Sequence, residues 1–379
     1  SFKLLNKPMG PIIHIILGRA NPNRLNGVNR VVHNLAEEQH SLGWNVSVWG
    51  ITASYKKVDE VERNYHTCWF PDKGYLRISL ALKAALLVSP KDTIFHFHGG
   101  FVLHYVSISR YLKKIKRNYV LTPHGAFSLG AMEKNKWLKA VYFSLLAKRL
   151  VRDAKAVQCL GHNEKSDLES LGDFQHIHLI PNGQNFDLLS TPDPDPTKAE
   201  FVIGYCGRIE QRAKGLDILL DSFRYYRQEL GGKGCLHLVG EGTYMEEMMQ
   251  TSREMGIDNY LHFWGKRFGE EKVQILAQMK LFVHSSRYEG LPTAVIEALS
   301  MGIPCLVSKA TSMDTYVKLA NAGWTYENND ITQIATYLKD AEKEHEKGIL
   351  IERGIRAIKM ARIEFSWREV ALKTQNLYT

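Results

Sequence analysis

Two glutamates flank a Gly-Leu-Pro turn in the segment HSSRYEGLPTAVIEALSMGIPCLVS, residues 284–308. Glu289 stands before the turn, and Glu297 follows eight positions later. Carboxylates are good acceptors for the hydroxyl groups of sugars. A single glutamate near a helix start is usually explained by its favourable placement at the helix dipole. Two glutamates around this turn, after a buried apolar run, instead favour a site for one extended ligand that carries hydroxyl groups.

The turn also predicts a helix start. KLFVHSS has the composition of a strand, RYEGLP that of a loop, and TAVIEALSMG that of a helix. Pro292 suits the first helical turn, where its missing N–H costs nothing. The first amides of a helix have no acceptor within it, so anionic or hydroxyl oxygens could accept from them. Here they are the amides of Gly290, Leu291, Thr293 and Ala294.

A basic loop, GYCGRIEQRAKGLD at residues 204–217, follows another apolar run and leads into a helix that starts near Gly215. Gly207 allows the backbone to turn sharply at the strand end. Arg208 offers a planar guanidinium and Lys214 a compact ammonium, a pairing that suits phosphate oxygens. The helix start would add its dipole. A solvated basic loop is the alternative to a phosphate site.

These residues need a scaffold, and the chain supplies alternating strand and helix patterns. Such alternation predicts an α/β fold with parallel sheets, and nearly continuous apolar strands indicate helices on both faces. The expected strands are 11–18, 44–51, 92–99, 119–125, 156–161 and 176–182, then 201–209, 235–242, 261–266, 281–286, 303–309 and 322–327.

A stretch rich in Pro and Asp, residues 186–199, separates the two series and is expected to be a linker. It divides the chain into two doubly wound domains, 1–185 and 200–364, with a ligand expected in the crevice at the carboxyl ends of the strands, between the domains. DPD at 193–195 matches a metal-binding DxD pattern, but its prolines favour a solvated turn.

Bulk properties narrow the class of partner. The net charge of +9 is compatible with nucleic acid, an anionic membrane or a phosphorylated ligand, or with no specific partner. No signature of a nucleic-acid-binding fold accompanies the charge, so no nucleic acid is expected. We find no membrane-spanning run and no signal peptide. Five cysteines without a CxxC pair, four of them in apolar runs, favour buried thiols in a reducing, cytoplasmic compartment.

The EGLPTAVIEA run with a following GIP, and the GR…KG pair upstream, resemble the retaining nucleotide-sugar glycosyltransferases of glycosyltransferase family four, which have the GT-B fold. The resemblance spans essentially the whole chain. NGVNRVVHNLAEEQHSLGWNVSVW resembles the family's N-terminal Gly-rich loop and first helix, TPHGAF its His-Gly loop, and LIPNGQNFD its hinge. FSWREVALKTQNLY resembles the last helix, which implies that residues 365–379 complete the first of two Rossmann-like domains facing each other across a cleft.

The resemblance implies a role for each matching residue. Arg208 and Lys214 would hold the donor diphosphate and neutralise the leaving group. Glu289 would contact the donor sugar, and Glu297 would bind the ribose hydroxyls. The implied catalytic set is Arg208, Lys214, Glu289 and His124, and the implied donor-binding set is Gly27, Gly207, Gly290, Leu291, Pro292, Thr293 and Glu297. No metal and no other cofactor are expected, because the cationic pair and the helix start would take that part.

Two residues of the first half complete this site. Gly27 would approach the diphosphate from the opposite domain, although the family's commoner Gly-Gly is Asn26-Gly27 here. His124 would lie beside the sugar; a lone histidine is often structural, but this one follows a strand end at the expected crevice. His96 and His98 are interpreted as packing residues, with acceptor contact as the less favoured alternative. The GR…KG spacing is one residue longer than the common form, so Arg212 competes with Lys214.

The basic, aromatic run at residues 133–154 has two interpretations. It could form a membrane-surface helix near a lipid-linked acceptor. The favoured alternative is a core helix with a solvated basic side. Its apolar face would consist of Trp137, Leu138, Val141, Tyr142, Leu145 and Leu146.

The sequence thus predicts a cytoplasmic enzyme, with contact at the inner face of the cell membrane left open. It would transfer a sugar, with retention, from a nucleotide-diphosphate donor to a hydroxyl of a glycan or lipid-linked acceptor. A UDP-sugar is the favoured donor, and polysaccharide or glycolipid assembly the expected process. The alternatives are a sugar-nucleotide 2-epimerase on the same fold and a non-catalytic sugar-nucleotide-binding protein.

Overall fold

A computed structural model describes residues 10–21, 27–56, 61–128, 132, 136–186, 200–287, 289, 291–327 and 330–379. The chain divides into two compact units: the first unit is Ser1–Gly183 with Trp367–Thr379, and the second is Gln184–Ser366. The boundaries expected at 185 and 365 lie within two residues of these. The expected linker, apart from Phe186, and the DPD pattern lie outside the described residues.

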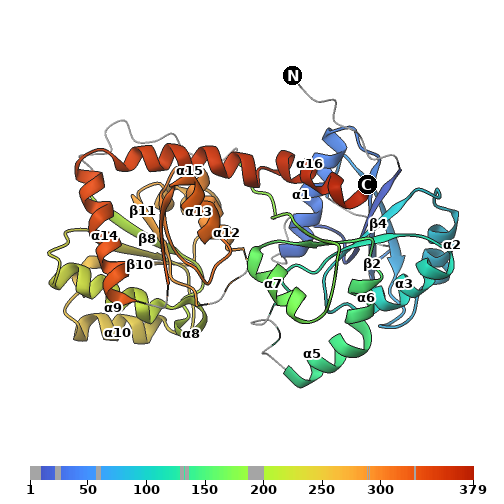
Figure 1. The fold of residues 1–379 in the computed structure, drawn as a ribbon, viewed down its shortest axis with the longest axis horizontal. Coiled ribbons are helices and arrows are strands. Elements are labelled where there is room, and N and C mark those ends of the chain that lie inside the picture. The colour runs from blue at the N-terminus through green and yellow to red at the C-terminus, as the bar shows by residue number, and fades with distance from the viewer. Residues whose placement is uncertain are drawn as a thin grey trace. The chain divides into compact units, whose positions relative to one another are not determined.

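In the described residues the first unit contains a seven-stranded sheet in the order β3-β2-β1-β4-β5-β6-β7, shown in Figure 1. Every strand pair is parallel. The strands are β1 Ile12–Leu17, β2 Val46–Thr52, β3 His66–Pro71, β4 Ile94–His98, β5 Tyr119–Thr122, β6 Ala156–Cys159 and β7 Ile177–Leu179.

Helices cover both faces of this sheet because its strands are apolar on both sides. Along β1, Ile12 and Ile16 join a core cluster that includes residues of α1 and α16, while Ile13 and Ile15 join the cluster on the opposite face. The helices are α1 Gly27–Ser41, α2 Leu80–Val88, α3 Leu103–Lys114, α5 Lys136–Tyr142, α6 Lys148–Arg152, α7 His162–Ser170 and α16 Trp367–Tyr378.

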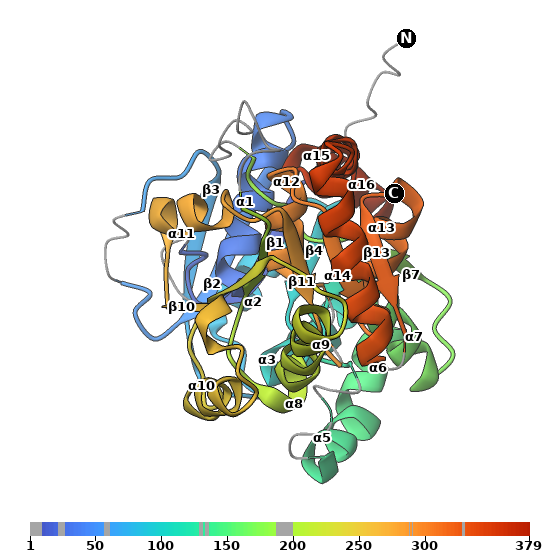
Figure 2. The same cartoon turned by 90° about the vertical axis from the view of Figure 1, so that its left-hand side faces the viewer.

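The second unit contains, in its described part, a six-stranded parallel sheet in the order β10-β9-β8-β11-β12-β13. Its strands are β8 Val202–Cys206, β9 Cys235–Val239, β10 Leu261–Gly265, β11 Leu281–His284, β12 Cys305–Ser308 and β13 Gly323–Tyr326. Its helices, seen from the side of this unit in Figure 2, are α8 Gln211–Lys214, α9 Leu216–Gln228, α10 Met245–Glu254, α11 Gly269–Leu276, α12 Thr293–Ser300, α13 Asp314–Ala320, α14 Ile331–Glu346 and α15 Leu350–Phe365.

Both sheets reverse their winding beside their first strand. β1 lies between β2 and β4, and β8 lies between β9 and β11. In doubly wound sheets a ligand binds outside the carboxyl ends of the strands at such a switch point. The residues that follow β8 and β11 are those of the basic loop and of the two-glutamate segment.

All twelve expected strands are present, and the described parts of the two sheets contain one more. The strand that the sequence did not reveal is β3, HTCWFP, at the edge of the first sheet. It is largely half-exposed and ends in Pro71, which an edge strand tolerates because one side needs no ladder hydrogen bonds. It therefore lacks the continuous apolar pattern of the other strands. Cys159, Cys206, Cys235 and Cys305 are buried on strands, as predicted.

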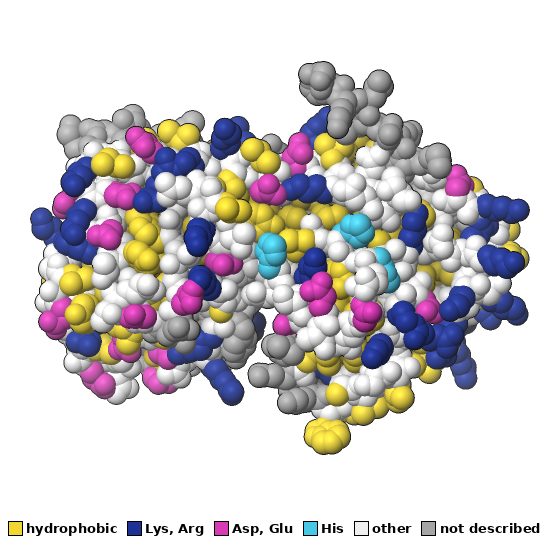
Figure 3. All heavy atoms as spheres, in the orientation of Figure 1, with side chains coloured by type: hydrophobic (Ala, Val, Ile, Leu, Met, Phe, Trp, Pro, Cys, Tyr) yellow, Lys and Arg dark blue, Asp and Glu magenta, His cyan; other side chains and the backbone are white. Residues whose placement is uncertain are grey.

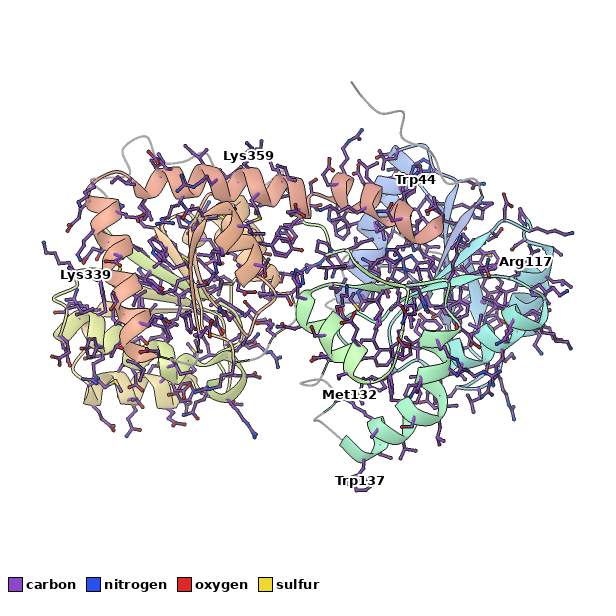
Figure 4. All side chains as sticks on the ribbon, in the orientation of Figure 1. Trp44, Arg117, Met132, Trp137, Lys339 and Lys359 are labelled. Atoms are coloured by element: carbon purple, nitrogen blue, oxygen red, sulfur yellow. The ribbon has the colours of Figure 1, made fainter. Side chains whose placement is uncertain are left out.

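The predicted core face of the basic run is wrong for four of its six residues, whereas Tyr142 packs against the core as predicted. Trp137, Leu138 and Leu145 are 85%, 74% and 71% exposed. Phe143, Ala147, Leu150 and Val151 are buried instead. A π-helical segment, Phe143–Ala147, separates α5 from α6, and its wider turn shifts the residues that face the core away from a 3.6-residue pattern. Figure 4 shows Trp137 at the tip of α5, with its side chain pointing outward.

Candidate active site

Lys214 and Glu289 meet beside the carboxyl ends of β8 and β11. Lys214 Nζ lies 2.8 Å from Glu289 Oε1. The other carboxylate oxygen, Oε2, lies 2.5 Å from His284 Nε2 and accepts a 3.0 Å hydrogen bond from Ser286 Oγ. His284 and Ser286 are buried, while Lys214 and Glu289 remain partly exposed. The structure thus joins two residues that are 75 positions apart in the sequence.

The surroundings of Glu289 favour its ionised form. Burial alone would raise the pKa of this carboxyl. The hydrogen bond and charge interaction with His284, together with the charge of Lys214, outweigh burial and hold the pKa well below its usual range. A carboxylate that is ionised at neutral pH only accepts hydrogen bonds. Glu289 is therefore suited to receive ligand hydroxyls and unsuited to donate a proton.

A glycine brings the two loops together. Gly215 ends α8 in the left-handed region, at φ 61°, and α9 begins at the next residue, as the sequence predicted. A Cβ at Gly215 would lie 2.2 Å from the Ser285 carbonyl oxygen. Ser285 Oγ in turn donates a 2.9 Å hydrogen bond to the Lys214 carbonyl. Only glycine combines this backbone conformation with so close an approach.

Arg287 fixes the same turn and was not identified from the sequence. Its guanidinium forms two hydrogen bonds with Asp217, of 2.9 and 2.7 Å, and donates 2.9 Å to the Gln211 carbonyl. Its backbone amide donates 3.0 Å to the Ala213 carbonyl. Bidentate pairing gives the guanidinium one orientation, so Arg287 holds the short helix that ends in Lys214. The one feature of the sequence that could have identified Arg287 is its place two positions before Glu289.

Arg208 lies on the loop after β8 and is 74% exposed. Its Nη1 lies 2.9 Å from Glu210 Oε1, and its carbonyl accepts a 2.8 Å hydrogen bond from Tyr205. Within the described residues Arg208 makes no ion pair with Glu289. Gly207 is packed beneath Tyr205, whose hydroxyl would lie 2.8 Å from an added Cβ. Arg212, the competitor for Lys214, is exposed, and Lys214 is the cation that contacts Glu289.

α12 begins at Thr293, where the predicted helix TAVIEALSMG begins, but Pro292 lies before its first turn and not within it. Pro292 precedes the helix as its N-cap, and its carbonyl accepts from the amides of Val295 at 3.1 Å and Ile296 at 3.4 Å. The amides of Thr293 and Ala294 are then those that the helix geometry leaves without an acceptor inside it. The side chain of Leu291 packs against the apolar core of the second unit. Gly290 lies outside the described residues.

Glu297 lies one turn inside α12 and forms an ion pair with Lys272 of α11. Both side chains are about three-quarters buried, at 25% and 23% exposure. Lys272 was not identified from the sequence, because its approach depends on how α11 packs beside α12. Glu289 therefore pairs with Lys214 and Glu297 with Lys272, and neither lysine bridges the two carboxylates.

Gly27 is the first residue of α1 and is exposed. A Cβ added at Gly27 would meet no atom within 4 Å. Its φ is outside the left-handed region that favours glycine. The described part of the chain therefore gives no internal reason for a glycine here. Asn26 lies outside the described residues.

His124 follows β5 in the left-handed region, at φ 54°, which is uncommon for a residue with a side chain. The next amide, of Gly125, donates a 2.5 Å hydrogen bond to Glu164, and the Leu160 amide donates 2.7 Å to the same carboxyl group. Glu164 is buried on α7, and burial raises its pKa. This side chain, which the sequence did not single out, holds the loop that carries His124.

His98 is internal, as expected for a packing residue, and it contacts His124 directly. His98 Nδ1 lies 3.0 Å from His124 Nε2. His98 is buried on β4, whereas His124 is partly exposed. His96, two positions earlier on β4, bonds instead to Thr122 and Tyr378, and so remains internal as expected.

No helix in the described part of the chain is long and apolar enough to cross a membrane.

Two family models match the chain. Residues 25–188 match the model described as Glycosyltransferase Family 4, and residues 192–354 match the model Glycosyl transferases group 1. The lipopolysaccharide 1,6-galactosyltransferase of Salmonella typhimurium is 28% identical over 141 residues, 36% of this chain and 38% of that protein. An Escherichia coli enzyme named UDP-Gal:alpha-D-GlcNAc-diphosphoundecaprenol alpha-1,3-galactosyltransferase is 27% identical over 212 residues, 52% of this chain and 51% of that enzyme. The chain thus spans less than two thirds of the length of these relatives.

Solved structures resemble the whole chain. Sucrose-phosphate synthase from Thermosynechococcus elongatus has a TM-score of 0.69 at 19% identity, covering 97% of this chain and 98% of that one. Anabaena Alr3699/HepE in complex with UDP has a TM-score of 0.71 at 17% identity, covering 95% and 97%. At such identities the likeness shows the fold, and it confirms the predicted GT-B architecture of two Rossmann-like domains.

Proposed function

Because this chain belongs to glycosyltransferase family four, we propose that it transfers a sugar, with retention, from a nucleotide-diphosphate donor to an acceptor hydroxyl in polysaccharide or glycolipid assembly. One observation carries the proposal. An ionised carboxylate, Glu289, and an ammonium, Lys214, meet at the switch point of the second sheet. A sugar diphosphate needs both: acceptors for its hydroxyls and a cation for its phosphates.

A UDP-sugar is the donor that we favour. One solved relative is described in complex with UDP, and one enzyme relative is named for UDP-Gal. The relatives named for lipopolysaccharide and for a diphosphoundecaprenol substrate support a glycan or lipid-linked acceptor.

Each residue then has a part in the reaction. The bond between the sugar and the phosphate oxygen breaks, and the nucleoside diphosphate leaves with that bond's electron pair. The acceptor oxygen bonds to the sugar, and the proton of the acceptor hydroxyl passes to solvent. Arg208 and Lys214 oppose the negative charge that develops on the leaving diphosphate. The amides of Thr293 and Ala294, at the start of α12, provide further donors to phosphate or sugar oxygens. Glu289 accepts from the sugar hydroxyls, and Glu297 accepts from the ribose.

A binding panel followed by product analysis tests this function. Thermal unfolding is measured with UDP-, GDP- and ADP-sugars, because a ligand of the native state raises stability by mass action. We expect a UDP-sugar to give the largest rise, and the purified protein to transfer or slowly hydrolyse it. Binding without turnover would favour the non-catalytic alternative, and a changed configuration at C2 of the sugar would favour the epimerase. Stabilisation by none of the donors would overturn the proposal.

We also propose that transfer needs no metal, since a cationic pair and a helix start face the leaving group. Transfer is expected to survive EDTA. Complete loss of activity that Mn²⁺ or Mg²⁺ restores would contradict this proposal. It would favour the DPD pattern at 193–195 as a candidate metal site.

A second proposal, contact with an anionic membrane, rests on α5 and the π-helical segment. Trp137, Leu138, Val141 and Leu145 are exposed there, and Figure 3 shows hydrophobic side chains gathered over this helix with Lys and Arg side chains beside them. Lys148, the first residue of α6 after the π-helical segment, is exposed. An apolar strip flanked by cations is typical of helices that lie in the interface of an anionic bilayer. Such contact would bring the enzyme to lipid-linked acceptors at the inner face of the cell membrane.

Vesicle sedimentation tests this contact. The protein is expected to sediment with vesicles that contain an anionic lipid and to remain in the supernatant with zwitterionic ones. Replacing Trp137 and Leu145 by Ser should abolish sedimentation. Ser at Leu80 and Val88, which are 83% and 80% exposed on α2, is the matched control and should change nothing. Equal sedimentation of both double variants would contradict a docking role for α5.

A further inference from the structure

Two groups of side chains in the described residues each bring together three atoms of the kind that bind metal ions. They are His14, His96 and His98 in the first unit, and Cys235, His237 and His262 in the second. In the first group both ring nitrogens of every histidine form hydrogen bonds with other side chains, so none is left for a metal ion. The second group is therefore the candidate.

The second group lies where β9 pairs with the edge strand β10. His237 and His262 are direct partners across the two parallel strands, and Cys235 lies two positions before His237 on the same face of β9. One ring nitrogen of each histidine and the Cys235 sulfur lie within 4.8 Å of one another. The sequence favoured a buried thiol for Cys235, since His262 comes beside it only when the two strands pair.

His237 has no protein partner that explains its burial. The residue is 6% exposed, and its Nδ1 is buried without a hydrogen-bond partner in the described part of the chain. On the same face of β9, Cys235 and Val239 belong to an apolar core cluster. Trp264 of β10 packs edge-on against the His237 ring, and its Nε1 is likewise buried without a described partner. Buried polar atoms are normally bonded, so this place lacks a ligand that the described residues do not supply.

A carboxylate stands beside these side chains. Burial raises the pKa of the Cys235 thiol to about 12, and the charge of Glu200, immediately before β8, adds to the rise. Burial lowers the pKa of His237 to about 4, an effect that His262 reinforces and Glu200 opposes. The imidazole is therefore neutral at pH 7, the form in which it binds a metal ion. Glu200 and His262 are exposed, which gives an ion a route from solvent.

The ligand types point to zinc. Thiolate sulfur, imidazole nitrogen and carboxylate oxygen are the ligands that Zn²⁺ takes in proteins, whereas Mg²⁺ and Ca²⁺ prefer oxygen alone. Bonds of about 2.3 Å to sulfur and about 2.0–2.1 Å to nitrogen place the ligand atoms of a tetrahedral zinc site about 3.3–3.6 Å apart. Atoms that lie within 4.8 Å reach that spacing by small side-chain rotations.

The charges of such a site would balance. Zinc binding displaces the proton of the Cys235 thiol, which passes to solvent. One thiolate and one carboxylate then offset the two positive charges of the ion, while both imidazoles are neutral. A neutral complex avoids the cost of an unpaired charge at a partly buried place.

We propose that Cys235, His237 and His262 bind one Zn²⁺ ion, with the Glu200 carboxylate as fourth ligand. The ion would join the start of β8 to β9 and to the edge strand β10. Its role would be structural, because Lys214 and Glu289 follow the carboxyl ends of β8 and β11, whereas Cys235 is the first residue of β9. The proposal does not rest on the proposed function and goes beyond it.

Titration of the tag-free, metal-free protein with Co²⁺ tests the site. Co²⁺ accepts the tetrahedral geometry of Zn²⁺, and its bond to a thiolate gives a charge-transfer band in the near ultraviolet. We expect this band to saturate at one equivalent of Co²⁺ and to disappear when Zn²⁺ is added. Mg²⁺ should leave it unchanged. A wild-type protein that shows no thiolate band would overturn the proposal, and would favour an ordered water as the partner of His237.

Variants with matched controls identify the ligands. Cys235→Ala should abolish the band, whereas Cys305→Ala, which removes a buried strand cysteine outside the group, should keep it. Because a buried variant can fail to fold, His262→Gln tests an exposed ligand on an edge strand. It should weaken Co²⁺ binding at least about tenfold, since even the outer partners of metal ligands are worth that much. His66→Gln, an exposed histidine on the edge strand of the other sheet, should bind as wild type does.

Equal affinities in His262→Gln and His66→Gln, or equal loss of the band in both cysteine variants, would overturn the site. Glu200→Gln should also weaken binding about tenfold, and an unchanged affinity would remove Glu200 from the ligand set.

Thermal unfolding and transfer test the structural role. Zn²⁺ should raise the melting temperature of wild type by mass action and leave that of His262→Gln unchanged. Well below the melting temperature, removal of zinc should leave kcat/KM for the donor within about twofold. A large loss of transfer without unfolding would contradict a purely structural ion. If wild type transfers no sugar from any donor, the proposed function fails, while the cobalt spectrum still decides the metal site.

Discussion

Lys214 Nζ and Glu289 Oε1 lie 2.8 Å apart, so the cation assigned to the donor phosphates also pairs with the carboxylate assigned to the donor sugar. When a diphosphate binds, Lys214 must share or exchange this partner. Glu289 then depends on His284 and Ser286, both of which contact its other oxygen.

Replacing Glu289 by Gln should therefore separate turnover from nucleotide binding. Glu289 acts at the sugar, where bonds break, so Glu289→Gln is expected to lower chiefly kcat. A free nucleoside diphosphate should bind at least as well as to wild type, because Lys214 loses a competing carboxylate. Steady-state kinetics and calorimetry with UDP measure the two effects.

Glu297→Ala should show the opposite division. Glu297 is assigned to the ribose, which the free nucleotide retains, so its loss should weaken UDP binding by about 1–3 kcal/mol. Calorimetry under the same conditions compares the two variants. If Glu289→Gln weakens UDP binding as much as Glu297→Ala does, the glutamates do not divide one ligand between them. If neither variant changes binding or turnover, the segment is only a well-capped helix.

Arg208→Ala should lower kcat/KM while the protein stays folded. The expected loss of transition-state stabilisation is about 2–4 kcal/mol, because the guanidinium would oppose charge on the leaving diphosphate. Arg208 is exposed, and within the described residues its ion pair is with nearby Glu210, so its loss should change stability little. Arg212→Ala, on the same loop and also exposed, is the matched control and should retain activity. Activity of Arg208→Ala within a factor of two of wild type would remove Arg208 from the site.

Gly27→Ala should affect the donor and not the fold. An added Cβ meets no atom within 4 Å, and alanine is the better helix former. The melting temperature is therefore expected to stay the same or rise slightly. If the diphosphate passes close to this backbone, the extra methyl group should raise KM for the donor several-fold. An unchanged KM would place the diphosphate away from α1.

Stability should fall as the pH drops below about 6.5. Burial lowers the pKa of His14 and His124 to about 4, and it lowers the pKa of His96 and His98 well below the usual value. The unfolded chain takes up protons that the folded chain refuses, so stability is full above about pH 6.5 and declines towards pH 4. Each histidine contributes a slope of up to about 1.4 kcal/mol per pH unit.

Urea unfolding at several pH values measures that slope. His96→Gln should be less stable at pH 7 but should lose stability less steeply on acidification. The number of protons taken up on unfolding should be smaller by about one. His66→Gln removes an exposed histidine of β3 and should leave the slope unchanged. A wild-type slope that His96→Gln does not reduce would show that other groups govern the acid response.

The sequence predicted most of the fold because parallel strands buried on both faces have a continuous apolar pattern. β3 escaped detection because an edge strand is half-exposed, and the face of residues 133–154 was misassigned because a π-helical segment breaks the 3.6-residue period. Local periodicity carries no information about either feature. The start of α12 at Thr293, by contrast, was predicted correctly, because a proline beside it marks the helix start in the sequence.

The same distinction applies to the site: what depends on local sequence could be predicted, and what depends on long-range packing could not. The functional residues next to strand ends could be located from loop composition and from the resemblance. Their partners could not, since Arg287, Lys272, Glu164 and His98 acquire meaning only through contacts made by packing distant elements. Whether the predicted residues bind a donor stays a prediction that the variants above address.

The place of α16 has a consequence for how the chain matures on the ribosome. The first unit is complete only when Trp367–Thr379 have been synthesised, after the whole of the second unit. Until then the buried polar groups of Gln39 and His96 lack Thr374 and Tyr378, and unpaired buried polar groups are unfavourable. The second unit is one continuous stretch and meets no such delay. Nascent chains stalled before residue 367 should show this as a protease-sensitive first unit, so that the two halves are expected to mature in the reverse of their order of synthesis.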